Sequence, residues 1–253
     1  MIKTAVILAA GFGKRLKLYE KPKGFLNISG QYLIEYSIQA LIACGIQKII
    51  IGTGFKSEFY DNLKSIYPQI VTRKNEDFTR TGSLKTLQLL ADLIDGDFLL
   101  LESDILYDAH CLNNMIALPQ KNVLLLAESP NEKDGVYVDV DEMKNLIRMT
   151  KDREHLANPL EGILVGITKM SFSTFERIIA ISDDLLSKNP YEHYDFSFEH
   201  LSKTDPFFVY DASPLIFTEV DDDEQLHYAL TAVYPKLTLP LKRYQEKGGL
   251  RSC

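Results

Sequence analysis

Residues 4–16 have the sequence Thr4-Ala5-Val6-Ile7-Leu8-Ala9-Ala10-Gly11-Phe12-Gly13-Lys14-Arg15-Leu16. The unbroken apolar run is typical of a strand that is buried on both faces of a sheet. The two glycines let the backbone approach a ligand closely and turn its N–H groups toward it, while Lys14 and Arg15 add positive charge beside phosphate oxygens. The stretch therefore predicts a buried first strand that ends in an anion-binding loop.

This loop differs from two well-defined phosphate-binding loops. A P-loop needs four residues between its first glycine and a Gly-Lys-Ser/Thr triplet, and the stretch has no such triplet. The dinucleotide fingerprint needs a third glycine three positions after the second, where this chain has Leu16. Gly52-Thr53-Gly54, rather than an acid, ends the next buried strand. A redox Rossmann protein is therefore disfavoured.

Apolar runs and helical periodicity alternate along the first half of the chain. Strands are predicted for residues 48–54, 70–72 and 98–104, and helices for residues 33–44, 57–67 and 82–93. Units of strand, helix and strand form parallel sheets with right-handed crossovers. Because ligands bind at the carboxyl ends of parallel strands, we expect the first loop, Gly52-Thr53-Gly54 and Asp104 to lie along one edge.

The second half has shorter strands of partly alternating pattern, which predict a mixed sheet with a lid or acceptor region. Strands are expected at residues 123–127, 136–140, 146–149, 162–167, 207–210 and 216–220, and helices at 172–181, 196–201 and 223–234. The predicted fold class is α/β, with a Rossmann-like, mixed but mainly parallel sheet flanked by helices. We expect a nucleotide-binding half up to about residue 115, an acceptor-binding half over 116–240, and a tail or linker over 241–253.

Composition excludes several classes of function. The net charge of −7 over 253 residues argues against a nucleic-acid surface, which requires a basic face. No stretch approaches the roughly 20 apolar residues that span a membrane. Cys44, Cys111 and Cys253 are odd in number and lack metal-ligand spacing, so neither a disulfide framework nor a zinc site is indicated. A cytoplasmic location is expected.

Leu8 to Leu16, followed by Lys21-Pro22-Lys23, resembles the signature of the sugar-nucleotide and alcohol-phosphate nucleotidyltransferases. These enzymes couple a nucleoside triphosphate to a phosphorylated small molecule, and the resemblance implies their GT-A-like fold over nearly the whole chain. Lys23-Gly24 and Thr81-Gly82-Ser83 look most like the 2-aminoethylphosphonate cytidylyltransferases. The bacterial choline-phosphate branch usually has Pro-Lys-Ala or Pro-Lys-Pro. The sugar branch usually carries a Pro and a Thr that residues 16–20 lack.

The resemblance implies a magnesium ion held by two aspartates, one closing the third apolar strand and one in a late Glu-Val/Ile-Asp strand. Asp104 and Asp221 fill these positions. Two carboxylates with phosphate oxygens and waters suit octahedral magnesium. The alternative for each aspartate is a helix cap, which we expect Asp222 or Asp223 to provide for the closing helix.

Three cations near the N-terminus are the predicted catalytic residues, because nucleotidyl transfer needs positioning and charge neutralisation at phosphorus. Lys14 and Arg15 are expected at the β- and γ-phosphates and Lys23 near the α-phosphate, whereas Lys21 is expected to be solvated. The expected nucleotide-binding residues are Leu8, Ala9, Ala10, Gly11, Phe12, Gly13, Thr81, Gly82, Ser83 and Ser103. For residues 81–83 the alternative is the start of a helix.

An acceptor that bears a primary amine requires carboxylates and aromatic faces. Asp139, Glu161, Tyr194 and Asp195 are the candidates by position in the second half. The phosphonate or phosphate of the acceptor is already an anion at neutral pH, so no general base is required.

Together these features predict a magnesium-dependent cytidylyltransferase that converts CTP and 2-aminoethylphosphonate into CMP-2-aminoethylphosphonate and pyrophosphate. The expected partners are CTP and a small phosphorylated or phosphonylated amino-alcohol, with no nucleic acid and no membrane. Phosphocholine, or a sugar 1-phosphate with UTP or dTTP, stays open as an alternative. From another class, a catalytically silent nucleotide-binding regulator is disfavoured by the intact lysines and aspartates. A homodimer and a fused or separate aminotransferase, which some members of the aminoethylphosphonate branch carry, also stay open.

Overall fold

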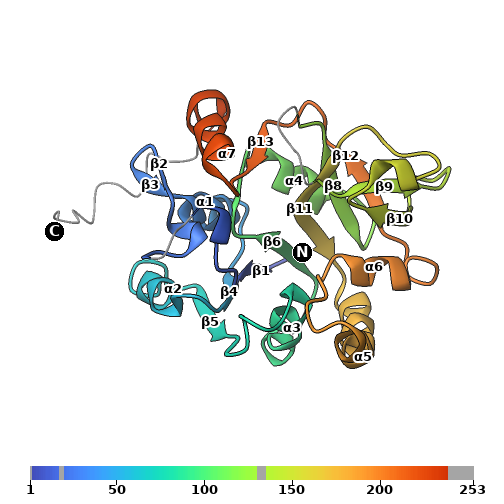
Figure 1. Ribbon diagram of the computed structural model, residues 1–253, viewed down its shortest axis with the longest axis horizontal. Coiled ribbons are helices and arrows are strands. Elements are labelled where there is room, and N and C mark those ends of the chain that lie inside the picture. Colours follow the sequence, from blue (N-terminus) through green and yellow to red (C-terminus); the bar gives the residue numbers. More distant parts are fainter. Residues whose placement is uncertain (1, 17–19, 130–134, 239–253) are drawn as a thin grey trace.

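The computed structural model describes residues 2–16, 20–129 and 135–238, and a seven-stranded sheet crosses its centre (Figure 1). The strand order is β12-β8-β11-β6-β1-β4-β5. The strands are β1 Thr4–Ala9, β4 Lys48–Thr53, β5 Ile70–Lys74, β6 Phe98–Glu102, β8 Val123–Ala127, β11 Ile163–Met170 and β12 Phe208–Asp211. Only β11 runs antiparallel to its neighbours in this sheet. The predicted mixed, mainly parallel sheet is confirmed.

The central strands end level with one another. Leu8 of β1 pairs with Gly52 of β4 and with Glu102 of β6, and Ala9 pairs with Thr53. The first loop and Asp104 therefore lie at the same edge of the sheet as the end of β4, as the positions of the strands in the sequence predict.

Helices cover both faces of the sheet. Helices α1 (Leu33–Ala43), α2 (Ser57–Leu63) and α4 (His110–Ala117) pack on one face, and α3 (Ser83–Gln88), α5 (Phe172–Lys188) and α6 (Phe196–Leu201) on the other. Strand β1 serves both cores, because Ala5 and Ile7 belong to the first and Val6 and Leu8 to the second. This double burial is the reason why β1 has no alternating polar positions.

Short elements surround the main sheet. They are β2 Asn27–Ile28, β3 Gln31–Tyr32, β7 Ile105–Tyr107, β9 Tyr137–Val140, β10 Leu146–Thr150, β13 Phe217–Glu219 and α7 Asp223–Tyr228. Strand β7 follows β6 directly and pairs antiparallel with β13, which places Ile105 opposite Glu219. The amide of Val220 also donates to the carbonyl of Asp104 at 2.8 Å. The pairing of β7 with β13 therefore places Asp221 next to Asp104.

Several helix boundaries differ from the predictions. The helix expected over 82–93 ends at Gln88. The guanidinium of Arg73 donates a hydrogen bond to the carbonyl of the next residue, Leu89, at 3.0 Å. The closing helix ends at Tyr228 and continues as a π-helical turn over Ala229–Val233. Helix α5 runs on to Lys188 because further leucines along it pack on the second core. Helix α4 and strand β7 were not predicted.

None of the helices in the described ranges combines the length and apolar character needed to cross a bilayer. The predicted tail, 241–253, lies outside the described residues.

Candidate active site

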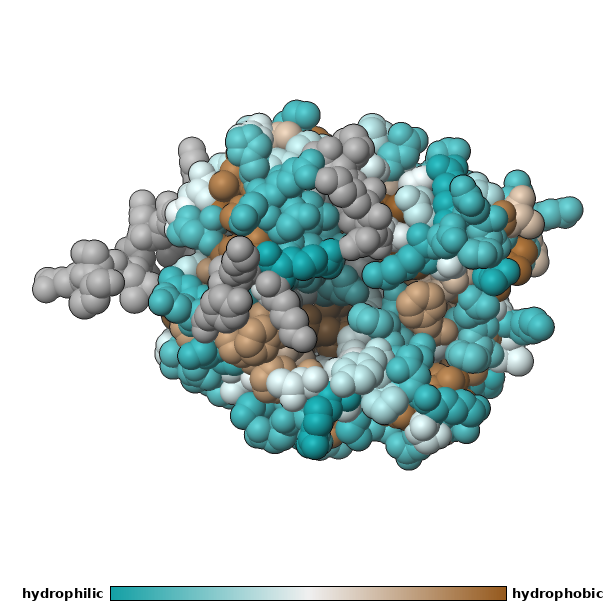
Figure 2. Space-filling view, viewed as in Figure 1, coloured by the Kyte–Doolittle hydropathy of each residue, from teal (hydrophilic) through white to brown (hydrophobic). Residues whose placement is uncertain are grey.

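A cavity of about 440 Å³ opens at the edge where the central strands end. Figure 2 shows it as a hollow near the middle of the molecule. Its walls come from the first loop, the end of β6, the start of α3, strand β11, the segment 191–198 and the end of β13. Segments from both halves of the chain therefore meet around one space.

Most of the predicted site residues line this cavity. They are Leu8, Ala9, Ala10, Gly11, Gly13, Arg15, Lys23, Thr81, Gly82, Ser83, Ser103, Asp104, Tyr194, Asp195 and Asp221. Lys14 begins a 3₁₀ turn with Arg15, and its side chain lies outside what the structure describes. The predicted residues thus form one site, although they come from segments far apart in the chain.

Three predicted residues are not among those that line the cavity. The ring of Phe12 packs on Phe55, with 4.2 Å between the ring centroids. The carboxylate of Asp139 is buried and accepts hydrogen bonds from the amides of Ala157 and Asn158 at 2.9 and 3.0 Å. Glu161 is exposed and pairs with Arg153 at 2.7 Å. The structure therefore does not bring Asp139 and Glu161 to the expected acceptor pocket.

The ammonium of Lys23 lies between two aspartates. It is 2.6 Å from Oδ2 of Asp104 and also contacts Asp221, which pairs with Arg15 as well. The side chains of Lys23, Asp104 and Asp221 are 14%, 18% and 7% exposed, so the three charges interact largely out of water. The two aspartates predicted to hold magnesium are adjacent, as expected, and both are bridged by the lysine predicted to act at the α-phosphate.

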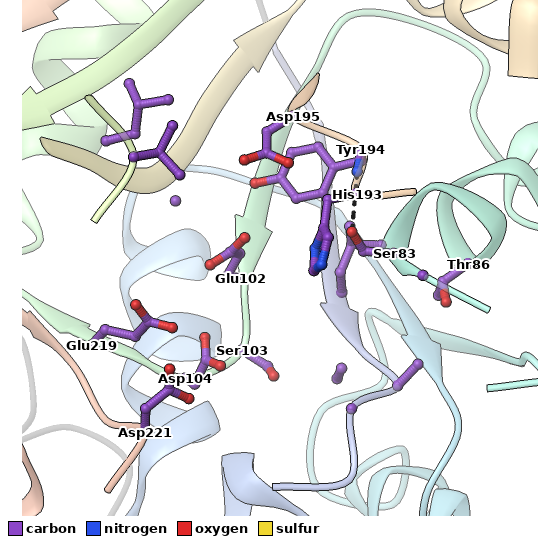
Figure 3. A pocket seen from close by; sticks show the side chains of 18 of the residues that line it. Ser83, Thr86, Glu102, Ser103, Asp104, His193, Tyr194, Asp195, Glu219 and Asp221 are labelled. Carbon is purple, nitrogen blue, oxygen red and sulfur yellow. Dashed lines mark hydrogen bonds between the residues drawn. The ribbon is translucent and has the colours of Figure 1, made fainter. Parts of the chain in front are cut away.

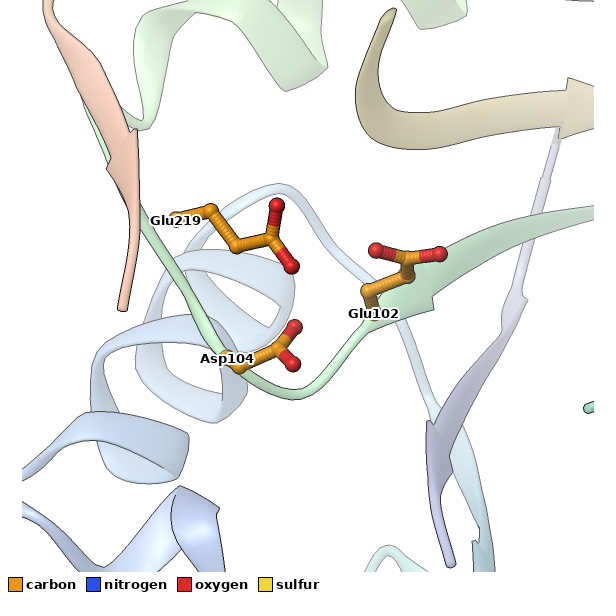
Figure 4. Close-up of side chains that lie close together, drawn as sticks. All are labelled: Glu102, Asp104 and Glu219. Carbon is orange, nitrogen blue, oxygen red and sulfur yellow. The ribbon is translucent and has the colours of Figure 1, made fainter. Parts of the chain in front are cut away.

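Two further carboxylates belong to this group. Oxygen atoms of Glu102, Asp104 and Glu219 lie within 4.8 Å of one another, and Figure 4 shows the three side chains converging. The sequence analysis missed Glu102 and Glu219 as site residues. Each stands two positions before a predicted aspartate, and in extended backbone residues i and i+2 point to the same side. That spacing is the signal that could have found them.

Burial changes the pKa values of two carboxylates that line the cavity. Burial raises the pKa of Glu102 well above its usual range, and the charges of Asp104, Glu219 and Asp195 raise it further. Burial also raises the pKa of Asp195. Glu102, Asp104, Glu219 and Asp221 form one group of four carboxylates, and Arg15 and Lys23 are the cations that pair with members of it. With all four carboxylates ionised, the group carries two more negative charges than these two cations balance. A divalent cation would balance this excess.

The residues present fit such a cation. Magnesium prefers oxygen ligands, and carboxylates are its usual protein ligands. Oδ1 of Asp104 is buried and has no hydrogen-bond partner among the described residues. Asp104 could therefore hold a metal together with Asp221, or with Glu102 and Glu219, which lie on its other side.

The segment 81–83 joins the two halves of the site. Gly82 precedes α3, so the predicted helix start is confirmed, and its amide donates to the carbonyl of Pro190 at 2.9 Å. The amide of Tyr194 donates to Oγ of Ser83 at 3.1 Å, as the dashed line in Figure 3 shows. A Cβ on Gly82 would lie 2.2 Å from the carbonyl oxygen of Glu192. Only glycine permits this contact, which sets the position of Tyr194 and Asp195.

Comparison with known proteins agrees with this geometry. Residues 5–118 match the family model of the MobA-like NTP transferase domain. This part of the chain is therefore a nucleotidyltransferase domain. The match covers the first loop, α3 and Asp104, which all contribute to the lining of the cavity.

The relatives of this nucleotidyltransferase include enzymes for different acceptors. A bifunctional sugar-1-phosphate nucleotidylyltransferase/acetyltransferase of Sulfurisphaera tokodaii is 30% identical over 181 residues, which cover 70% of this chain and 43% of that protein. A 2-aminoethylphosphonate cytidylyltransferase of Lancefieldella rimae is 22% identical over 192 residues, which cover 74% of this chain and 75% of that protein. The chain thus spans less than half the length of the first relative.

A solved structure of the CTP:phosphocholine cytidylyltransferase of Streptococcus pneumoniae superposes with a TM-score of 0.76 at 20% identity, covering 89% of this chain and 97% of that chain. This likeness confirms the nucleotidyltransferase fold. The relatives and this fold neighbour are all nucleotidyltransferases, and two of the three are cytidylyltransferases.

Proposed function

We propose that this nucleotidyltransferase is a magnesium-dependent cytidylyltransferase that joins CMP to an aminoalkylphosphonate, with 2-aminoethylphosphonate as the expected acceptor. The observation that carries the proposal is the acidic lining of the cavity, which continues from Asp104 and Asp221 past Glu102 to Asp195 (Figure 3). One end suits a metal-bound triphosphate, and the other suits an acceptor with a cationic head. The relationship to a 2-aminoethylphosphonate cytidylyltransferase supports the same acceptor.

In the proposed reaction an oxygen of the phosphonate attacks the α-phosphorus of CTP. The bond from that phosphorus to the bridging oxygen breaks, and the electron pair leaves with pyrophosphate. Lys23 would contact the α-phosphate and offset the charge that grows in the transition state, with Arg15 and Lys14 at the β- and γ-phosphates. A magnesium ion held by Asp104 and Asp221 would supply further charge neutralisation at the phosphate oxygens.

We assign the two halves of the chain to the two substrates. The first loop and residues 81–83 would bind CTP, with the backbone of Ala10 and Gly11 and the hydroxyls of Thr81 and Ser83 near the base. Residues beyond about 115 would bind the acceptor through Tyr194 and Asp195. These are small diffusible substrates, which is compatible with the predicted cytoplasmic location.

Phosphocholine is the second candidate acceptor. Aromatic side chains line the acceptor end of the cavity, among them Tyr191, Tyr194 and Phe196, and a quaternary ammonium binds to aromatic faces. The fold shared with the CTP:phosphocholine cytidylyltransferase is compatible with phosphocholine as the acceptor.

Pyrophosphate release tests the proposal. CTP, UTP, dTTP and ATP are crossed against 2-aminoethylphosphonate, phosphocholine, phosphoethanolamine and glucose 1-phosphate, each with magnesium. We expect release with CTP and 2-aminoethylphosphonate. Release with phosphocholine instead would make phosphocholine the acceptor, and release with UTP and glucose 1-phosphate would overturn the proposal. No release with any pair would favour a catalytically silent nucleotide-binding regulator.

A further inference from the structure

Glu102 lies between the two ends of the cavity. Figure 3 shows its carboxylate between the Tyr194–Asp195 pair on one side and Asp104, Glu219 and Asp221 on the other. It ends β6 and pairs with Leu8 of β1, and the ladder between β6 and β11 reaches its neighbour Leu101. Neither the predicted nucleotide contacts nor the predicted acceptor contacts include it.

The neighbouring strand β11 has a β-bulge next to the side chain of Glu102. The register between β11 and β8 shifts between Leu164 and Thr168, and Gly166 within the shift has a φ of +78°. A Cβ at Gly166 would come within 3.0 Å of Oε2 of Glu102. The backbone conformation therefore favours glycine, and any larger residue would press on the Glu102 carboxylate. The bulge brings the backbone of β11 against one side of the Glu102 carboxylate, which limits the directions in which that carboxylate can point.

Asp195 supplies a second oxygen atom that can accept a hydrogen bond, and it lies beside Tyr194 on one side of Glu102 (Figure 3). It stands immediately before α6, yet its side chain makes no capping hydrogen bond. Its Oδ1 atom is buried and has no hydrogen-bond partner among the described residues. Buried polar atoms in native proteins are nearly always hydrogen-bonded, so an oxygen of this kind in a cavity wall points to a donor that a ligand brings.

The aromatic rings beside these carboxylates are occupied by packing. The ring of Tyr194 is 3% exposed and lies edge-on to Phe198, with 5.7 Å between centroids. Phe198 in turn stacks on Phe207 at 4.6 Å. The ring of Tyr194, which lies beside Glu102, is thus occupied by packing, and the carboxylate oxygens of Glu102 and Asp195 are the charged groups next to it. An unsubstituted ammonium has three N–H donors for such oxygens, and a quaternary ammonium has none.

We propose that Glu102 is the specificity-determining residue for the acceptor: together with Asp195 it accepts hydrogen bonds from a primary ammonium, and it disfavours quaternary ammonium and neutral acceptors. This inference rests on the proposed function, because it assigns the acceptor to this end of the cavity. It goes further in naming the residue and in choosing between the two candidate acceptors.

The test compares three phosphonates of similar length: 2-aminoethylphosphonate, its N,N,N-trimethyl analogue and n-propylphosphonate. Turnover with CTP and magnesium is measured for the wild type and for Glu102→Gln, which keeps the shape and removes the charge. Glu176→Gln, on the exposed side of α5, is the matched control. Because a hydrogen bond to a charged group contributes about 1.5–3 kcal/mol, we expect Glu102→Gln to lower kcat/KM for 2-aminoethylphosphonate by roughly 10- to 150-fold. The loss for n-propylphosphonate, which has no ammonium, should be about tenfold smaller or less, and Glu176→Gln should change neither value.

An equal loss for all three phosphonates would overturn the inference and indicate a role at the metal or in the fold. An unchanged preference, or a wild type that favours the trimethyl analogue, would overturn it too. If Glu102→Gln does not fold, Asp195→Asn takes its place with the same expected pattern.

Calorimetric binding separates this inference from the proposed function. The three phosphonates are titrated into wild type and variant with magnesium and with the nucleoside triphosphate that most raises the melting temperature. Selective binding of the primary amine, lost in Glu102→Gln, would support the assignment of Glu102 even if CTP gave no turnover. Turnover with CTP and no charge selectivity would leave the proposed function and remove the inference.

Discussion

Replacing Lys23 with methionine should weaken both stability and catalysis, because its ammonium neutralises two aspartates. Methionine keeps the apolar stem and removes the charge. Asp104 and Asp221 are at most 18% exposed, so the variant would leave two carboxylates close together and out of water. Removing one partner from a buried ion pair costs about 3–5 kcal/mol, and we expect about 3 kcal/mol because the cavity admits water and ions.

Magnesium should restore part of this loss. A divalent cation between Asp104 and its neighbouring carboxylates would take over the role of the missing ammonium. Urea unfolding with and without magnesium measures this recovery, which should be larger for Lys23→Met than for the wild type. A loss of stability that magnesium does not change would contradict the idea that lysine and metal share these carboxylates.

The same variant should lower kcat more than it raises KM for CTP. Removal of one group that offsets transition-state charge costs about 10²–10³ in kcat. The control is Lys21→Met, because Lys21 is exposed and its ammonium is 5.6 Å from the ring centroid of Tyr32. We expect Lys21→Met to stay within about 0.5 kcal/mol of the wild type. An unchanged kcat with a raised KM in Lys23→Met would make Lys23 a substrate-binding residue only.

Three further variants test other parts of the site. Asp104→Asn should abolish pyrophosphate release while circular dichroism shows a folded protein; activity like that of the wild type in magnesium would remove Asp104 from the metal site. Gly82→Ala should raise KM for the acceptor and lower stability by about 1–3 kcal/mol, because its Cβ would lie 2.2 Å from a carbonyl oxygen; an unchanged melting temperature would count against that contact. Asp139→Ala should lower stability by about 1–3 kcal/mol for each of the two amides that it leaves unpaired, measured by urea unfolding. Its acceptor KM should not change, and a selective rise in that KM would return Asp139 to the acceptor pocket.

The sequence predicted the elements with strong local patterns. The bounds of α6 and of β8 agree with the prediction, and β4 ends one residue earlier than expected. Helix α4 was missed because only Cys111, Leu112 and Met115 along it are fully buried. An apolar face this narrow becomes decisive only when the sheet beneath it is known.

The site residues divide in the same way. The place of Asp104 and Lys23 in one cavity could be predicted because each lies in a recognisable local motif, and their roles in catalysis stay predictions. The sequence could not show that Asp139 and Glu161 lie outside the lining of the cavity, because their partners come from loops that the sequence does not place. These partners are two backbone amides for Asp139 and the guanidinium of Arg153 for Glu161. Position in the second half of the chain was too weak a criterion for the acceptor pocket.

The sequence by itself determined the alternation of buried strands and helices and the chemistry of the first loop, because apolar periodicity and loop glycines act over a few residues. Only the tertiary structure decided which carboxylates share the cavity. The pairing of β7 with β13 sets Glu219 opposite Ile105 and so brings Asp221 to Asp104, and the Gly166 bulge fixes the surroundings of Glu102. Such contacts depend on strand pairing between distant segments, and no local pattern encodes that pairing.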